Sequence, residues 1–142
     1  MLFLLFALAL APQAHDLPMK VIAQGPLSDI ATARQVVVRD AEAWQKLWQA
    51  HGVTKLPPKV DFDQRMVVGV FLGTRPSSGY QVGIDRAYLD GADLVVDYVV
   101  HQPGPGTMTA PVMTAPYILV ILPSHTGPVR FVDTTAAHAR RR

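Results

Sequence analysis

Residues 66–72 read Met-Val-Val-Gly-Val-Phe-Leu, a run of seven residues without a polar side chain. A strand with one face in water alternates apolar and polar residues, so an uninterrupted apolar run is typical of a strand covered on both faces. Residues 117–122, Tyr-Ile-Leu-Val-Ile-Leu, have the same character. Both runs are therefore expected in the middle of a sheet or beneath a covering helix.

Further short segments separated by glycine and proline clusters also have the composition of strands. They are residues 19–24, 35–39, 80–87, 94–101 and 129–132. Apolar side chains occur at alternate positions in two of these segments, 80–87 and 94–101. Tyr80, Val82 and Ile84 are therefore directed to one face, because successive side chains of a strand point to opposite faces. The pattern predicts a mostly β fold of the α+β class, with about seven antiparallel strands in a sheet or sandwich-like domain.

One amphipathic helix is predicted at about 41–51, packed on the sheet. Asp40 can cap its first amides, and Gly52 suits a left-handed terminus. Trp44 and Trp48 lie four residues apart, so they share one helix face and can be buried together against the sheet. We expect this tryptophan pair to be structural.

Composition limits the possible functions. The chain has 142 residues, of which 49% are hydrophobic and 17% charged, which suits one folded domain, expected over 18–133. Cysteine is absent, which excludes disulfides, thiolate metal sites and cysteine nucleophiles. The net charge of +2 depends on Arg140, Arg141 and Arg142. Without these three residues the chain has ten basic and eleven acidic side chains. We therefore expect no nucleic-acid partner, and a flexible basic tail over 134–142.

The start of the chain resembles a secretory signal. Residues 2–11 are all apolar, and small residues follow at Ala11 and Ala14. A membrane span needs about 20 apolar residues, so this run is too short for a stable anchor. We expect residues 1–14 to be a signal-like segment and the protein to be exported, either periplasmic or secreted.

The sequence lacks a recognisable reactive site. No two of the five histidines have the spacing of paired metal ligands, so surface histidines are expected; a site joining His101 and His125 is the alternative. Asp61 and Asp63 are expected to be solvated turn residues. No Gly-x-Ser-x-Gly motif is present, and prolines alternate with Gly104 and Gly106, which removes amides that could bind phosphate. No catalytic residue, metal or cofactor is predicted.

The most informative loop is residues 73–80, Gly-Thr-Arg-Pro-Ser-Ser-Gly-Tyr. It is expected to form the tip of a hairpin, stiffened by Pro76, with Gly79 free to adopt a positive φ. Arg75 would present a planar set of donors, and Tyr80 an amphipathic ring. Two interpretations remain open: a well-formed turn without further role, or a binding loop.

Residues 101–116 are the second conspicuous segment, rich in proline and glycine and poor in charge. A loop of this length is uncommon in a compact domain and is often functional. It is either a partner-binding edge or a long crossover. The candidate partner-binding residues of the two segments are Arg75, Pro76, Ser77, Ser78, Gly79, Tyr80, Pro103 and Pro105.

Several motifs together resemble the C-terminal domain of the PrcB family. They are Val60-Asp61-Phe62, residues 66–73, the Arg75-Pro76-Ser77-Ser78-Gly79-Tyr80 loop, Pro103-Gly104-Pro105-Gly106, and Thr114, Pro116 and Tyr117. The resemblance covers about 18–133; where the family usually has a second glycine, this chain has Ser78. It implies an exported bacterial domain associated with a secreted protease complex, without assigned catalytic residues. The same loop is similar, more loosely, to the Asn-Pro-Thr-Thr-Gly-Tyr loop of chagasin-like peptidase inhibitors, with Arg75 in place of the asparagine.

The leading hypothesis is a noncatalytic exported module that binds a protein, associating with or stabilising a secreted or cell-envelope protease. The alternatives are a small-ligand or envelope-polysaccharide binder, which would use the tyrosines and tryptophans, and a chagasin-like inhibitor. A hydrolytic or metal-dependent enzyme and a purely structural subunit are further alternatives. No oligomeric state is predicted.

Overall fold

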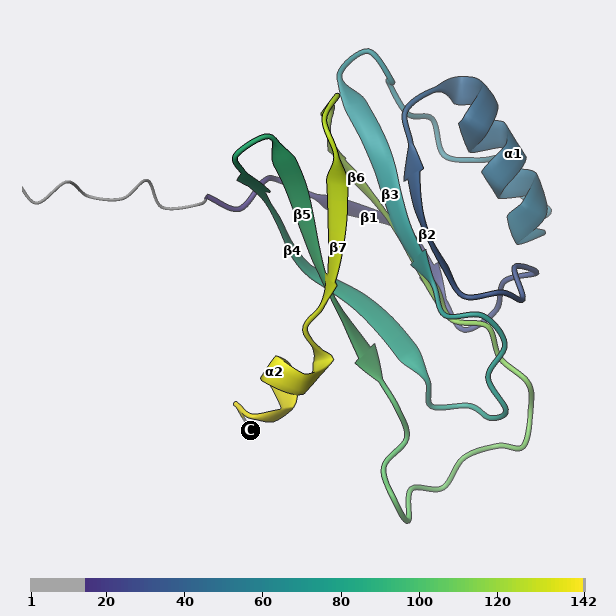
Figure 1. Ribbon diagram of the computed structural model, residues 1–142. Coiled ribbons are helices and arrows are strands. Elements are labelled where there is room, and N and C mark those ends of the chain that lie inside the picture. Colours follow the sequence, from purple (N-terminus) through teal and green to yellow (C-terminus); the bar gives the residue numbers. More distant parts are fainter. Residues whose placement is uncertain (1–14, 142) are drawn as a thin grey trace, which may run out of the picture.

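The computed structural model describes residues 15–141, so the expected signal-like segment 1–14 lies outside the described residues. Across this range the chain forms seven strands and two helices (Figure 1). In chain order they are β1 (Lys20–Gly25), β2 (Arg34–Val38), α1 (Ala41–His51), β3 (Arg65–Phe71), β4 (Gln81–Asp90), β5 (Asp93–His101), β6 (Tyr117–Pro123), β7 (Val129–Asp133) and α2 (Thr135–Ala139). The mostly β fold and the predicted strands are confirmed.

The strands form two sheets that face each other. The first has the order β1-β6-β3-β2 and the second the order β4-β5-β7. The two uninterrupted apolar runs, β3 and β6, are the inner strands of the four-stranded sheet and pair along their full length. This is the position that their composition predicts, because an inner strand covered on both faces has no solvent-facing side.

One strand pairing differs from the expected antiparallel arrangement. Strand β7 pairs with β5 in parallel, from Leu94 opposite Val129 to Tyr98 opposite Asp133. The chain reaches β7 from β6 of the other sheet, through residues 124–128. Because β7 is not joined to β5 by a hairpin, no tight turn imposes an antiparallel direction on it.

The main core lies between the two sheets. Met66, Val68 and Val70 of β3 face Leu94 and Val96 of β5 across it. The alternate residues of β3, among them Val67 and Phe71, point to the outer face, where a second cluster forms beneath α1. Because successive side chains of a strand point to opposite faces, the apolar strand β3 contributes side chains to both cores.

Helix α1 covers the outer face of the four-stranded sheet, as predicted (Figure 1). The Asp40 carboxylate accepts a hydrogen bond from the Ala43 amide at 2.8 Å, and Gly52 ends the helix with φ +82°. Trp44 and Trp48 are buried, and their indole N–H groups donate to the carbonyls of Pro58 and Lys55. The tryptophans therefore also fix the connector that follows the helix.

The end of the chain differs from the expected flexible tail. Residues Thr135–Ala139 form α2, which lies beside the end of β5 (Figure 1). The Val100 amide donates to Thr135 Oγ1 at 3.0 Å, and His138 Nδ1 lies 3.4 Å from Asp85 Oδ2. These side-chain contacts fix a segment whose composition alone suggests a frayed end. No helix in the described range is long and apolar enough to span a membrane.

Replacing Trp44 should test the structural assignment of the tryptophan face. Trp44→Ala removes a side chain that is 4% exposed together with its bond to Pro58, so unfolding in urea should show a loss of about 3–5 kcal/mol. The exposed neighbour Gln45 provides the control, and Gln45→Ala should stay within about 0.5 kcal/mol of the wild type. A loss for Trp44→Ala no greater than that of the control would contradict this assignment.

Candidate functional site

The loop at residues 72–80 is not the hairpin tip that the sequence suggests. Strand β3, which precedes it, belongs to the four-stranded sheet, and β4, which follows it, belongs to the three-stranded sheet. The loop therefore carries the chain from one sheet to the other. The hairpin prediction fails because two adjacent strands in sequence pair only if both remain in one sheet, and each of these has other partners.

Residues 102–116 make the reverse crossing, from β5 to β6, and bond to the first loop. Arg75 and Thr114 exchange two backbone hydrogen bonds of 2.7 and 2.9 Å. The Ser78 amide donates to the Ala110 carbonyl at 3.1 Å, and the Ala110 amide donates to Ser78 Oγ at 2.8 Å. We call residues 73–80 together with 102–116 the loop pair. Both crossings of the chain are thus joined into one structure.

The structure brings most of the predicted site residues together in this loop pair. Gly79 has φ +94°, and a Cβ there would lie 3.2 Å from Pro103 Cβ, so the two loops touch at a position that favours glycine. Pro76 and Gly79 are exposed, whereas Arg75, Ser77, Ser78 and Tyr80 are half-buried. Pro105 is exposed further along the second loop. The loop is therefore only partly available to a partner.

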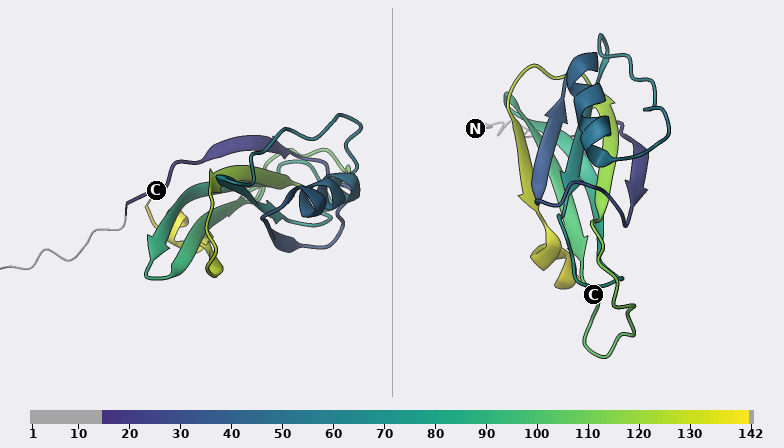
Figure 2. Two further views of the ribbon diagram at one scale, coloured as in Figure 1. Left: turned by 90° about the horizontal axis from the view of Figure 1, so that it is seen from above. Right: turned by 90° about the vertical axis from the view of Figure 1, so that its right-hand side faces the viewer.

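The sequence analysis missed the most exposed apolar side chains of the loop pair. Met108 is 98% exposed, Met113 71% and Val112 51%. All three belong to the second loop, which extends beyond the ends of the strands (Figures 1 and 2). The signal that could have found them is the absence of charged side chains from residues 102–116.

A pocket of about 470 Å³ opens beside the loop pair, between the two sheets. Ser78, Gly79 and Tyr80 form one wall, and Gln24 and Tyr117 contribute to the other. The Gln24 side-chain amide donates to the Val82 carbonyl at 3.2 Å and so links β1 to β4 beside the pocket. Aromatic rings and uncharged polar groups line this space, which lacks ionised side chains.

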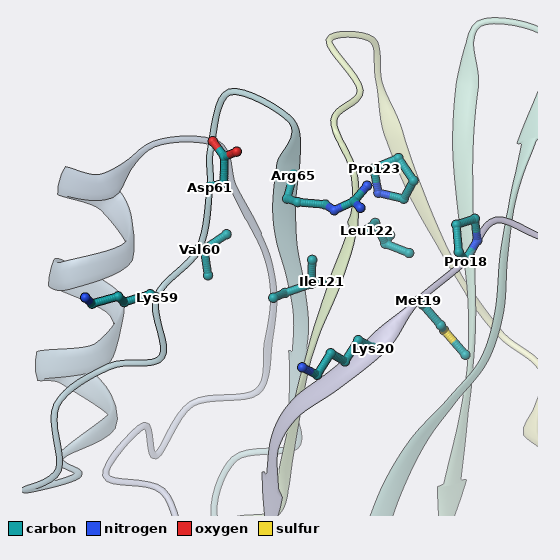
Figure 3. Close-up of a pocket in the computed structure, with 10 residues that line it drawn as sticks. All are labelled: Pro18, Met19, Lys20, Lys59, Val60, Asp61, Arg65, Ile121, Leu122 and Pro123. Atoms are coloured by element: carbon teal, nitrogen blue, oxygen red, sulfur yellow. The ribbon is translucent and has the colours of Figure 1, made fainter.

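A second pocket, of about 320 Å³, lies on the outer face of the four-stranded sheet, beside the connector after α1. Lys20, Lys59, Asp61 and Arg65 surround an apolar surface that includes Ile121. Figure 3 shows these charged groups pointing in different directions: Lys59 extends away from Ile121, and Asp61 is at the upper rim. Because general acid–base chemistry needs groups that converge on one reacting atom, this arrangement does not resemble a reactive centre.

The histidines and acids named from the sequence also lie apart. His101 is at the end of β5, whereas His125 bonds to the Ala92 carbonyl at its start, so a nine-residue strand of about 30 Å separates them. Asp61 and Asp63 are exposed in a turn, where Asp61 Oδ1 accepts from the Asp63 amide. Among residues 15–141, no group of three potential ligands could hold a metal ion.

His51 contradicts the expectation of surface histidines. It is only 2% exposed, its Nδ1 lies 2.7 Å from Ser28 Oγ, and its ring packs 4.1 Å from that of Tyr117. Its Nε2 is buried without a hydrogen-bond partner in the described part of the chain. Burial lowers the pKa of His51, while Asp29 opposes this change. The spacing of Trp44, Leu47, Trp48 and His51 is the signal that could have revealed this, because residues at i, i+3, i+4 and i+7 share one helix face.

Two other groups have altered acidity. Burial raises the pKa of Asp97, which the nearby Arg86 partly offsets, and burial also raises the pKa of Tyr117. Asp97 lies on β5 of one sheet and Tyr117 on β6 of the other. Altered groups that share a cleft would suggest an active site. These groups are instead explained by local burial.

Comparison with known proteins adds a family. Residues 66–123, which run from β3 through both loops to the end of β6, match the family model described as PrcB C-terminal. Over these residues the chain is similar to the PrcB C-terminal domain. No curated protein and no solved structure matches the chain. The PrcB match is shorter than the expected 18–133, but it includes every residue of the loop pair and both inner strands that support it.

His51 should make stability depend on pH. Because burial lowers its folded-state pKa below 6.5, the unfolded chain takes up a proton first as pH falls below about 6.5. The free energy of unfolding should then decrease, by at most about 1.4 kcal/mol per pH unit, until the folded state also becomes protonated. Urea unfolding at pH 7.5 and pH 5.5 measures this loss, which should be smaller in His51→Phe.

The exposed His101 supplies a matched control, because His101→Gln removes a histidine without changing the buried cluster. This variant should keep the pH dependence of the wild type. An equal pH dependence in wild type and His51→Phe would mean that His51 is not the responsible group.

Proposed function

We propose that this protein is a noncatalytic module that binds another protein through the loop pair. One observation supports this proposal above the others: three large apolar side chains, Met108, Val112 and Met113, are exposed on a protruding loop that lacks charge. Exposed apolar surface gathered in one place is typical of an interaction site. Methionine suits such a surface because its flexible side chain adapts to different partner shapes.

The hydrogen bonds within the loop pair support the same function. Four backbone and side-chain bonds connect Arg75 and Ser78 to Thr114 and Ala110. A loop that is already ordered loses less conformational entropy when it binds, so more of the contact energy contributes to affinity. The loop that carries the exposed apolar side chains is therefore preorganised, because Val112 and Met113 lie between the bonded residues Ala110 and Thr114.

We further propose that the partner is an exported bacterial protease or its precursor. This step depends on the similarity to the PrcB C-terminal domain and on the association with a secreted protease complex that the resemblance implies. Export itself is proposed from the apolar run at residues 2–11. The domain would associate with the protease or stabilise it and would contribute no catalytic residue.

A small-ligand function is the second candidate. The pocket of about 470 Å³ beside the loop pair, with Tyr80 and Tyr117 in its walls, favours it. The envelope-polysaccharide version of this hypothesis loses its main support, because Trp44 and Trp48 are buried in the core and are not available to stack on a sugar. The separate alternative, a chagasin-like peptidase inhibitor, depends on the resemblance of a single loop, and that loop crosses between sheets here.

Site-specific crosslinking tests the proposed surface. A photoreactive amino acid placed at Met108, in the full protein in its source envelope, should form an adduct with one partner, and the Met108→Ser/Met113→Ser double variant should bind that partner at least tenfold more weakly. Leu56, which is 91% exposed on the connector after α1, provides the control position for both measurements. If positions 56 and 108 give the same adducts, or the double variant binds normally, the loop pair is not the binding surface.

A further inference from the structure

The edges of the two sheets lie side by side where β2 and β7 end their respective sheets (Figure 2). At one end, Arg39 joins them: its Nε and an Nη donate to the carbonyls of His125 and Gly127, at 3.0 and 2.6 Å. Further along, Gln35 of β2 donates to the Tyr98 hydroxyl of β5 at 3.2 Å. The sandwich is therefore closed by side chains at this edge, without strand pairing.

Beyond Gln35 the edges separate around a pocket of about 400 Å³. Residues of both sheets and of the loop pair line it, among them Arg34, Phe71, Arg75, Tyr98 and Asp133. Neither the known family nor the sequence motifs assign a role to this pocket. Its connection with the candidate site is Arg75, the one residue that belongs to both.

Each of the two arginines of this pocket lies over an aromatic ring, and neither has an anionic partner among the described residues. The Arg34 guanidinium lies 5.9 Å from the Phe71 ring centre, and that of Arg75 lies 5.7 Å from the Tyr80 ring centre. Arg75 Nε is buried and makes no hydrogen bond within residues 15–141. A buried donor without an acceptor is costly and rare, so Arg75 retains hydrogen-bonding capacity that contacts within the described residues do not use.

The single carboxylate in the pocket wall, that of Asp133, is not the missing acceptor for Arg34 or Arg75. Asp133 Oδ1 accepts from the Thr135 amide at 2.9 Å and from the Thr135 hydroxyl, which directs it towards the start of α2. Within the described residues, neither Arg34 nor Arg75 forms a salt bridge. With two arginines and one aspartate, the pocket keeps a net positive charge.

We propose that this pocket binds a carboxylate of an acidic segment of the protein partner, held by Arg34 and Arg75. Arginine presents its donors in a planar fork that matches a carboxylate, and stacking on aromatic rings limits its motion beforehand. Because β2 and β7 are both edge strands, an extended segment can run along the sandwich edge beside the pocket. The inference depends on the proposed function, since it supplies the chemistry by which the same partner is recognised.

NMR titration of the full protein tests this inference directly. The probe is the peptide acetyl-Gly-Glu-Glu-Gly-amide, and its control is the matching Gln peptide at equal ionic strength. We expect the Nε–Hε resonances of Arg34 and Arg75 to shift and saturate with the Glu peptide and to remain in place with the Gln peptide. Arg34→Gln should weaken binding of the Glu peptide at least tenfold, whereas Arg65→Gln, at an exposed arginine of β3, should leave it unchanged.

Each other result has a defined meaning. Equal shifts with both peptides, or weakening by Arg65→Gln as large as by Arg34→Gln, would replace specific carboxylate recognition with nonspecific binding and overturn the inference. Saturation by inorganic phosphate at lower concentration than the Glu peptide would overturn it in favour of a phosphate site. If Arg34→Gln leaves partner binding intact while Met108→Ser/Met113→Ser abolishes it, the loop pair remains the binding surface and only the pocket inference fails.

Discussion

The pairing of β3 with β6 is the constraint on which the rest of the structure depends. Val67 and Val68 of β3 and Leu119 and Val120 of β6 are all inaccessible to solvent, although neighbouring residues of each strand face opposite sides. One side of this pair holds the three-stranded sheet and the other holds α1. Two cores therefore share one pair of strands, and a disturbance of their register would expose both.

The same pair also determines where the loops lie. Strand β3 ends and β6 begins at the same end of the sheet, opposite each other at Phe71 and Tyr117. The loop that leaves β3 and the loop that enters β6 therefore start side by side, and their backbones bond as they cross to the other sheet. The candidate binding surface is thus a direct extension of the most buried part of the protein, which supports the base of both loops.

Polar groups at the margins of this framework are held mainly by uncharged neighbours. His51 rests against Ser28 and Tyr117 in the outer core, and Arg75 is placed by its backbone pairing with Thr114. Under the proposed binding function, the side-chain donors of Arg75 are offered to an acceptor of the incoming partner.

The sequence by itself determined the strands, the helix with its caps, and the central position of residues 66–72 and 117–122, because hydrophobic period and capping are local properties. It also identified the loop pair as two separate segments of unusual composition. Only the tertiary structure decided that these segments bond to each other, that β7 runs parallel to β5, and that residues 135–139 form a helix. It likewise decided that Met108 is exposed. These outcomes depend on contacts between residues far apart in the chain, and no local pattern of side chains specifies which distant backbone will arrive beside them.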